Sequence, residues 1–239
     1  MTNRIADISL RQAAIVAGFG LLIMMIPGLF ANFFVLESLI VPGDVATTTN
    51  NILANESLFR IAICSFIIVI ILDVVVAWAL YVFLKPVNKS ISLLAAWFRL
   101  VFATIFGIAL AYLFSVLLLL SGADYLTVFE TDLLHAQVML FLNAFRYGEN
   151  IAYVFFSLHL LILGYLVFKS SYSGYIPRIL GVLLIIAGFG YLIDNFGKLL
   201  FPNYDANIAM FTFIGEVLFM LWLLIKGVKD QLPATTEAG

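Results

Sequence analysis

Charged residues are scarce in this chain of 239 residues. Only 11% of them are Asp, Glu, Lys or Arg, whereas 64% are hydrophobic and the mean hydropathy is +1.13. A soluble domain carries about a quarter charged residues, so the composition excludes one and predicts a membrane protein. The formal net charge of −2 comes without a basic block, which excludes a nucleic-acid partner. The expected partners are membrane lipids, with a small solute or another protein as further candidates.

Residues that carry chemistry are also few. The chain has one cysteine, Cys64, and two histidines, His135 and His159, which lie at different depths of consecutive helical segments. This set does not suit a structural zinc site or a haem held between facing helices. No H-E-x-x-H, G-x-S-x-G or P-loop motif occurs. We therefore expect no metal, no cofactor and no catalytic residue. A lipid-modifying enzyme that uses Glu216 and His159 as acid and base is a lesser alternative.

Six apolar segments are long enough to cross a membrane, which takes about 20 helical residues. Barrel strands would instead alternate in segments of about ten residues. The sequence therefore predicts an all-α polytopic bundle in a single transmembrane domain over residues 1–230, with a disordered tail at 231–239. The first segment exceeds the core of a cleaved signal peptide, so we expect it to be retained. The predicted spans are residues 12–34, 58–84, 91–120, 149–168, 178–200 and 207–227.

Two places depart from this simple pattern. Pro27 lies inside the first span and should kink that helix or mark its last turns, because proline removes a backbone hydrogen bond. The stretch 133–147 is apolar enough to be helical but carries His135, Asn143 and Arg146. It is either an extra outer amphipathic helix or a prolongation of the fourth span. We favour an extension that protrudes outside or lies at the interface.

The positive charges predict the orientation of the chain, because cytoplasmic loops are enriched in Lys and Arg. With six spans, these residues fall mostly on one side and acidic residues dominate the other. Both termini are therefore predicted to be cytoplasmic. The residues on the predicted cytoplasmic side are Arg4, Arg11, Lys85, Lys89, Lys169, Arg178, Lys226 and Lys229.

Four ionisable residues fall deep within the predicted spans: Asp73, Arg99, His159 and Glu216. A charge near the bilayer centre costs at least about 2.5–3.5 kcal/mol, so each needs a partner, water or neutralisation. At a rise of about 1.5 Å per residue, they lie roughly 13–16 Å from the cytoplasmic ends. Arg99 could therefore bridge Asp73, Glu216 or both. Alternatively, one of these carboxyls is protonated and serves proton coupling.

Local patterns refine the expected positions of two of these residues. Arg99 begins a series of small residues, which predicts that it faces the bundle because small residues let helices approach closely. The simplest interpretation of His159 is a hydrogen bond to a neighbouring helix. The small residues recur at intervals of four and are Ala103, Gly107, Ala111 and Ser115.

A second polar group is predicted near the outer ends of the spans. Arg146 precedes Glu149 by three residues and Asn150 by four, spacings at which helical side chains meet. We expect a vestibule that opens to the outside, with the Arg99 group at its floor. The alternative is a set of ion pairs that only fix which helices are neighbours. The predicted vestibule residues are Arg60, Asn143, Arg146, Glu149, Asn150, Asp194 and Lys198.

Six groups of residues carry a family resemblance. They are Arg11 with Ala13, Ala14 and Gly18, and the strings Leu80–Lys89, Ala95–Arg99, Leu158–Leu166, Tyr175–Gly181 and Glu216–Leu223. Together they resemble a family of small bacterial six-helix integral membrane proteins, domain of unknown function 4386. The resemblance covers nearly the whole chain. It implies a multi-pass protein of the bacterial cytoplasmic membrane, and it brings no established activity, ligand or catalytic residue.

The depth-matched set of Asp73, Arg99 and Glu216 motivates the leading hypothesis on function. It is a non-enzymatic membrane protein whose outward polar pocket binds or passes a small solute or a proton. The alternative is a structural or partner subunit of a membrane complex, in which these residues only lock the bundle.

Overall fold

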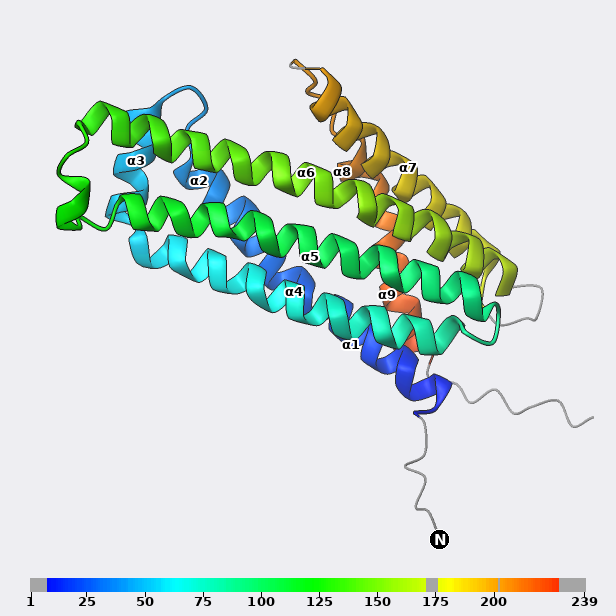
Figure 1. Cartoon of the computed structure of the whole chain (residues 1–239). Helices are drawn as coiled ribbons and strands as arrows, with labels where there is room; N and C mark the ends of the chain where they lie inside the picture. The colour runs from blue at the N-terminus through cyan, green and yellow to red at the C-terminus, as the bar shows by residue number, and fades with distance from the viewer. Residues whose placement is uncertain (1–7, 171–175, 202, 228–239) are drawn as a thin grey trace, which may run out of the picture.

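The computed structural model describes residues 8–170, 176–201 and 203–227, which form helices packed side by side (Figure 1). No strand occurs among these residues, which confirms the predicted all-α class. The predicted tail at 231–239 lies outside the described residues, as do Arg4 and Lys229. The elements in chain order are α1 (Leu10–Leu29), the π-helix η1 (Phe30–Leu36), α2 (Glu37–Leu39), α3 (Val45–Ala54), α4 (Glu56–Leu84), α5 (Lys89–Leu119), the 3-10 helix η2 (Asp124–Leu126), α6 (Thr131–Ser170), α7 (Arg178–Leu200), α8 (Ile208–Thr212) and α9 (Ile214–Ile225).

Six stretches of helix within the described residues are long and apolar enough to cross a membrane, as predicted. Large apolar side chains such as Ile26, Ile71 and Ile108 are exposed on their outer faces. Lipid tails accept such a surface, whereas water would not. The chain is therefore a multi-pass membrane protein. The spanning stretches are Leu10–Leu39, Glu56–Leu84, Lys89–Leu119, Thr131–Ser170, Arg178–Leu200 and Ile208–Ile225.

Polar side chains cap the first turns of several helices. The hydroxyl of Ser9 accepts a hydrogen bond from the backbone N–H of Gln12, whose side chain accepts one in return from Ser9, so the two form a capping box at α1. Asn88 accepts from the backbone N–H of Ile91 at the start of α5. These caps satisfy N–H groups that a helix leaves unpaired at its start. They explain why α1 and α5 begin where they do.

The first span changes its helical form after Pro27. The α-helix continues through this residue to Leu29, and the chain then winds as a π-helix over Phe30–Leu36. Single π-helical turns are rare and often occur at functional sites. This wider stretch carries Asn32 and Leu36. Asn32 belongs to the outer polar group described below, and Leu36 lines the pocket beside it.

The helix α6 is the longest element, with 40 residues. The stretch 133–147 forms its first part, so the fourth span is prolonged and no separate outer helix is present there. At about 1.5 Å per residue, α6 is roughly 60 Å long, about twice the thickness of a hydrocarbon core. One end of α6 must therefore extend beyond the membrane interior.

Glycines allow α6 to pack closely on α7. A Cβ atom placed on Gly181 would lie 2.6 Å from the backbone nitrogen of Phe168 and 2.7 Å from the backbone oxygen of Gly164. A Cβ atom on Gly164 would meet the backbone of α7 at the same separation of 2.7 Å, at the oxygen of Gly181. Such contact of helix backbones is the usual way in which small residues hold membrane helices together. α6 packs against α5 on its other side (Figure 1).

The ends of the helices gather in two groups. The start of α1, the turn between α4 and α5, the end of α6, the start of α7 and the end of α9 lie at one end of the bundle (Figure 1). The segments α2 and α3, the start of α4 and the connection from α5 to α6 lie at the other end. We call the second end the outer end, after the orientation predicted from the sequence. The buried charges lie between these two groups.

Candidate functional site

An ion pair joins α4 to α5 inside the bundle. Arg99 Nη2 lies 2.6 Å from Asp73 Oδ1, and the two residues are only 2% and 1% exposed. Arg99 Nη2 also lies 3.5 Å from the sulfur of Met24 on α1. Arg99 is about 15 Å along α5 from Lys89, at about 1.5 Å per residue. The pair therefore lies deep within the span.

His159 approaches the same guanidinium from α6. Its Nε2 lies 3.3 Å from Arg99 Nη1, and its Nδ1 lies 2.8 Å from the backbone oxygen of Ala95. A guanidinium has no acceptor, so Nε2 must accept; a carbonyl has no donor, so Nδ1 must carry the proton. The surroundings therefore fix His159 as a neutral imidazole in one tautomer.

Glu216 completes this group from the first turn of α9. Its carboxyl lies within electrostatic range of Arg99 and Asp73 and close to the hydroxyl of Tyr191 on α7. The helix is interrupted at Phe213, just before Glu216. The structure thus brings Asp73, Arg99, His159 and Glu216 into one group, which we call the deep cluster.

Three atoms of the deep cluster are buried without a hydrogen-bond partner among the described residues. They are Asp73 Oδ1, Arg99 Nε and Glu216 Oε1. The contact of Arg99 with Asp73 is therefore a close ion pair that lacks the alignment of a hydrogen bond. Buried polar atoms are nearly always paired, so Arg99 Nε and Glu216 Oε1, which have neither a hydrogen bond nor an ion pair among the described residues, mark a site with unused capacity to bind.

Aromatic side chains separate the deep cluster from the outer end. Tyr153 on α6 stacks on Tyr191 on α7, with ring centroids 5.6 Å apart. Phe156 lies between these rings and the deep cluster, 5.5 Å from Tyr191 and 5.9 Å from His159. Tyr153 is within electrostatic range of Glu216 on one side and of Glu149 on the other. Tyr153 thus lies between the two polar groups, and Tyr191 stacks beside it.

The outer polar group is built around Arg146. Its Nη1 donates a hydrogen bond to Oε2 of Glu149, at 3.0 Å, and another to Oδ1 of Asn32, also at 3.0 Å. Glu149 is 6% exposed, whereas the Arg146 side chain is 36% exposed. The contact with Asn32 ties α6 to η1. Arg146 therefore has one buried anchor and an accessible face.

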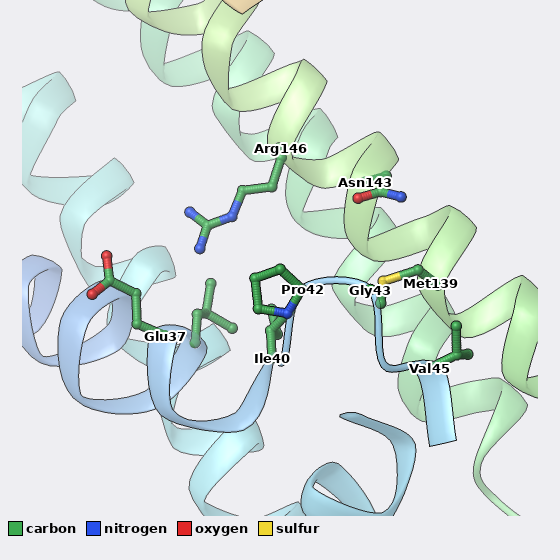
Figure 2. A pocket seen from close by; sticks show the side chains of 9 residues that line it. Glu37, Ile40, Pro42, Gly43, Val45, Met139, Asn143 and Arg146 are labelled. Atoms are coloured by element: carbon green, nitrogen blue, oxygen red, sulfur yellow. The ribbon is translucent and has the colours of Figure 1, made fainter. Parts of the chain in front are cut away.

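Arg146 lines a pocket of about 520 Å³ between α6 and the segment that follows η1. Figure 2 shows Arg146 extending from α6 toward the segment that carries Glu37 and Pro42, with Asn143 one turn away on the same helix. The deep cluster does not line this pocket, so it does not form the predicted floor. The lining residues are Leu36, Glu37, Ile40, Pro42, Gly43, Val45, Met139, Asn143 and Arg146.

The loop at the rim of this pocket is held by α3. Asp44 caps α3 by accepting hydrogen bonds from the backbone N–H and the hydroxyl of Thr47. These bonds stabilise the ionised carboxylate and lower the pKa of Asp44 from its usual value of 3.8. Thr48 bonds the backbone of Val41 in both directions. Gly43 adopts a φ of +79°, which favours glycine.

Three of the predicted vestibule residues lie elsewhere. Arg60 pairs with Glu56 one turn earlier on α4, at 2.7 Å on the surface, and does not join Arg146. Asp194 is buried and accepts hydrogen bonds from the hydroxyl of Tyr204 and the backbone N–H of Ala209. The bond from Tyr204 raises the pKa of this tyrosine. Lys198 is exposed and forms no ion pair with Asp194. Asn150 is half-buried beside Glu149.

Sequence reasoning did not assign Asn32, Glu37, Tyr153 or Tyr191 to either polar group. The tyrosines resemble ordinary membrane aromatics. A signal for Tyr153 was present, because it follows Arg146 by seven residues, a spacing that places both on nearly the same face of α6. Asn32 carries a weaker signal as a lone amide in an apolar run.

Comparison with known proteins agrees with this architecture. The family model described as "Domain of unknown function (DUF4386)" matches residues 16–227. The chain belongs to this family. It is also similar to a protein from Archaeoglobus fulgidus named "Uncharacterized protein", with 42% identity over 168 residues, which cover 70% of this chain and 85% of that protein. No solved structure matches the chain. The resemblance to DUF4386 inferred from the sequence is confirmed.

Proposed function

We propose that this DUF4386 protein binds a small zwitterionic solute with an apolar body in the pocket between α6 and the η1–α3 segment. One observation carries the proposal: Glu37 and Arg146, which have opposite charges, line the same pocket of about 520 Å³. Small-molecule sites typically enclose about 300–1,000 Å³ and combine apolar walls with a few placed polar groups. This pocket fits that description.

Arg146 supplies the group for the anionic end of the solute. Its hydrogen bonds from Nη1 to Asn32 and Glu149 fix the guanidinium in place. Within the described residues it forms no hydrogen bond through Nη2 or Nε, so these donors are available to a carboxylate. An arginine held by a buried carboxylate binds another planar anion without much further ordering.

Glu37 supplies the group for the cationic end. It lies in the first turn of α2, is exposed and forms no ion pair within the described part of the chain. Because Glu149 already neutralises Arg146, the charge of Glu37 is in excess at the pocket. A purely anionic solute would meet this excess negative charge, whereas an ammonium group would balance it. Charge complementarity therefore favours a zwitterion.

The apolar wall accounts for the body of the solute. Five aliphatic side chains line the pocket beside the two charges. A branched alkyl group of a few carbons would bury its surface against them, at roughly 25 cal/mol per Å² of apolar area. The wall is formed by Leu36, Ile40, Pro42, Val45 and Met139.

We infer from the predicted orientation of the chain that this pocket lies outside. We infer that both termini are cytoplasmic, since Lys and Arg gather at the opposite end of the bundle. Asn143 lies about 40 Å along α6 from Ser170, at about 1.5 Å per residue, which exceeds a hydrocarbon core of about 30 Å. The pocket would then lie at the outer membrane–water boundary, open to solutes there.

Three probes that share an isobutyl group test the proposal. Leucine carries both charges, isopentylamine only the ammonium and isovalerate only the carboxylate. We expect leucine to raise the unfolding temperature of the purified full-length protein more than either single-charge probe. Glu37→Gln and Arg146→Met should each abolish the effect of leucine. Glu56→Gln is the matched control, because it removes an outer carboxylate that pairs with Arg60 away from the pocket.

The alternative function makes a different prediction. If the polar residues only hold the bundle together or a partner subunit in place, none of the three probes shifts the unfolding temperature, while Arg146→Met lowers it. That result would reject the pocket as a solute site. Equal stabilisation by leucine and isovalerate would reject the zwitterion and leave an anion site.

A further inference from the structure

The deep cluster holds more negative than positive charge. Asp73 and Glu216 contribute two carboxyls and Arg99 one guanidinium, while the contacts of His159 keep its imidazole neutral. We infer that the deep cluster is a proton-binding site, in which Glu216 holds one proton at neutral pH. This inference does not depend on a ligand in the outer pocket, which the cluster does not line.

The charge count follows from hydrogen-bond chemistry. A second proton on His159 would place a donor against Arg99, which offers only donors. His159 therefore adds no positive charge to the cluster. With both carboxyls ionised, the cluster would carry one net negative charge among Asp73, Arg99 and His159, which are 1–2% exposed, and the half-buried Glu216. A net charge in the membrane interior is unfavourable and is removed by pairing or by protonation.

Geometry selects Glu216 as the carboxyl that takes the proton. Asp73 is in direct contact with Arg99 at 2.6 Å, and this contact favours its ionised form. No ion pair of that kind is found for Glu216 within the described residues, and its Oε1 is buried without a hydrogen-bond partner. An ionised carboxylate needs several donors, whereas a protonated one supplies a donor itself. Glu216 has the surroundings of the protonated form.

The groups that face Glu216 come from each helix around it. Asp73 faces it from α4, Arg99 from α5, Tyr153 from α6 and Tyr191 from α7. The helix α1 also packs against α9. Between Leu10 and Leu29 its one ionisable side chain is Arg11, at the far end of the helix. Arg99 is therefore the cation opposite the two carboxyls.

The deep cluster suits a proton better than a metal ion. Groups of three or more His, Cys, Asp or Glu side chains that could hold a metal ion do not occur among the described residues. The cluster offers two carboxyls around a guanidinium, and the guanidinium repels a metal cation. A proton fits because it bonds one oxygen and needs no coordination shell. Sodium is nevertheless the competing cation that an experiment must separate.

Infrared spectroscopy of the full-length protein in lipid nanodiscs counts the protonated carboxyls. The carbonyl stretch of a carboxylic acid is separate from the bands of a carboxylate and shifts in deuterated water. At neutral pH, we expect one such group in the wild type. Glu216→Gln and Asp73→Asn should each remove the band, because either change leaves one carboxylate to balance Arg99. Arg99→Gln should double it, because two carboxyls then lack a cation.

The control is Glu149→Gln, which alters the charge-balanced pair with Arg146 and should leave the band unchanged. If Arg99→Gln does not fold, the two carboxyl variants still decide the matter. A wild type without the band, or a band that persists in both Glu216→Gln and Asp73→Asn, would overturn the inference. A band that appears only after sodium is removed would also overturn it, in favour of sodium binding.

Discussion

Arg99 Nη2 lies 2.6 Å from Asp73 Oδ1, in a contact that joins α5 to α4 where both side chains are buried. Two further residues lie beside this pair: Glu216, which adds a second carboxyl, and the neutral His159. Breaking a buried pair is costly mainly because it strands the remaining charge. The stability of the bundle should therefore depend on which charges remain after a substitution, and not only on the packing that the substitution removes.

Arg99→Met should destabilise the protein strongly, by about 3–5 kcal/mol, because it leaves the buried Asp73 carboxylate without its cation. Adding Asp73→Asn should recover much of this loss, since the double variant keeps only Glu216, which can be protonated. The free energy of unfolding in detergent, measured by denaturant titration for the single and double variants, checks this. A double variant whose loss equals the sum of the single losses would show that the two residues are not coupled.

His159→Leu should lower the free energy of unfolding by about 1–3 kcal/mol, because it leaves the oxygen of Ala95 and a donor of Arg99 unpaired. His159→Gln should cost less, since its amide has both a donor and an acceptor. Nitrogen NMR of the wild type should show a neutral ring protonated at Nδ1. Detection of an imidazolium at neutral pH would contradict the tautomer and the charge count based on it.

Gly181→Ala should weaken the contact of α6 with α7 by about 1–3 kcal/mol, because the added methyl meets backbone atoms that cannot move aside. A Cβ atom on residue 181 would lie 2.6 Å from the backbone nitrogen of Phe168. Gly107→Ala is the matched control, because a Cβ there would lie 3.7 Å from Ile70 and fits. The measurement is the unfolding temperature of each variant relative to the wild type. Equal effects would show that close packing at Gly181 is not what joins the helices.

The cap formed by Asp44 should make the outer loop sensitive to acid. The pKa of Asp44 is lower in the folded chain than its ordinary value of 3.8. Its contribution to stability is therefore complete above that value and is lost as the pH falls through the folded pKa. Asp44→Asn should keep the cap and lose this pH dependence, whereas Asp44→Ala should lose both. Amide hydrogen exchange of residues 45–54 against pH measures the effect, and identical profiles for all three proteins would contradict it.

The spans were predictable because segment length and hydropathy are local properties of a sequence. The small-residue series from Arg99 was informative only at its start. Arg99 and Ala103 are buried, whereas Ala111 is exposed. A spacing of four residues advances about 40° per step around an α-helix, so a series of five positions turns away from its neighbour. The position of Arg99 inside the bundle followed from its immediate neighbours in that series.

The pocket depends on features that lie outside such local patterns. Glu37 reaches the pocket because η1 winds as a π-helix and a loop with Gly43 then turns the chain back toward α6. Arg60 pairs within its own helix because Glu56 is one turn away. The sequence alone did not show that Arg60 prefers Glu56 to the polar group around Arg146. Which helices are neighbours, and at what rotation, decides these contacts.

Cysteine labelling at the pocket tests the central claim most directly. Asn143 is exposed and lines the pocket, and Cys64 can be replaced by alanine so that Asn143→Cys is the single thiol. A membrane-impermeant thiol reagent should label this variant in intact cells, and leucine should slow the labelling several-fold while isovalerate does not. In the same background, Glu37→Gln should remove the protection. Labelling that requires permeabilised cells, or that proceeds at the same rate with and without leucine, would contradict an outward-facing pocket that binds a zwitterion.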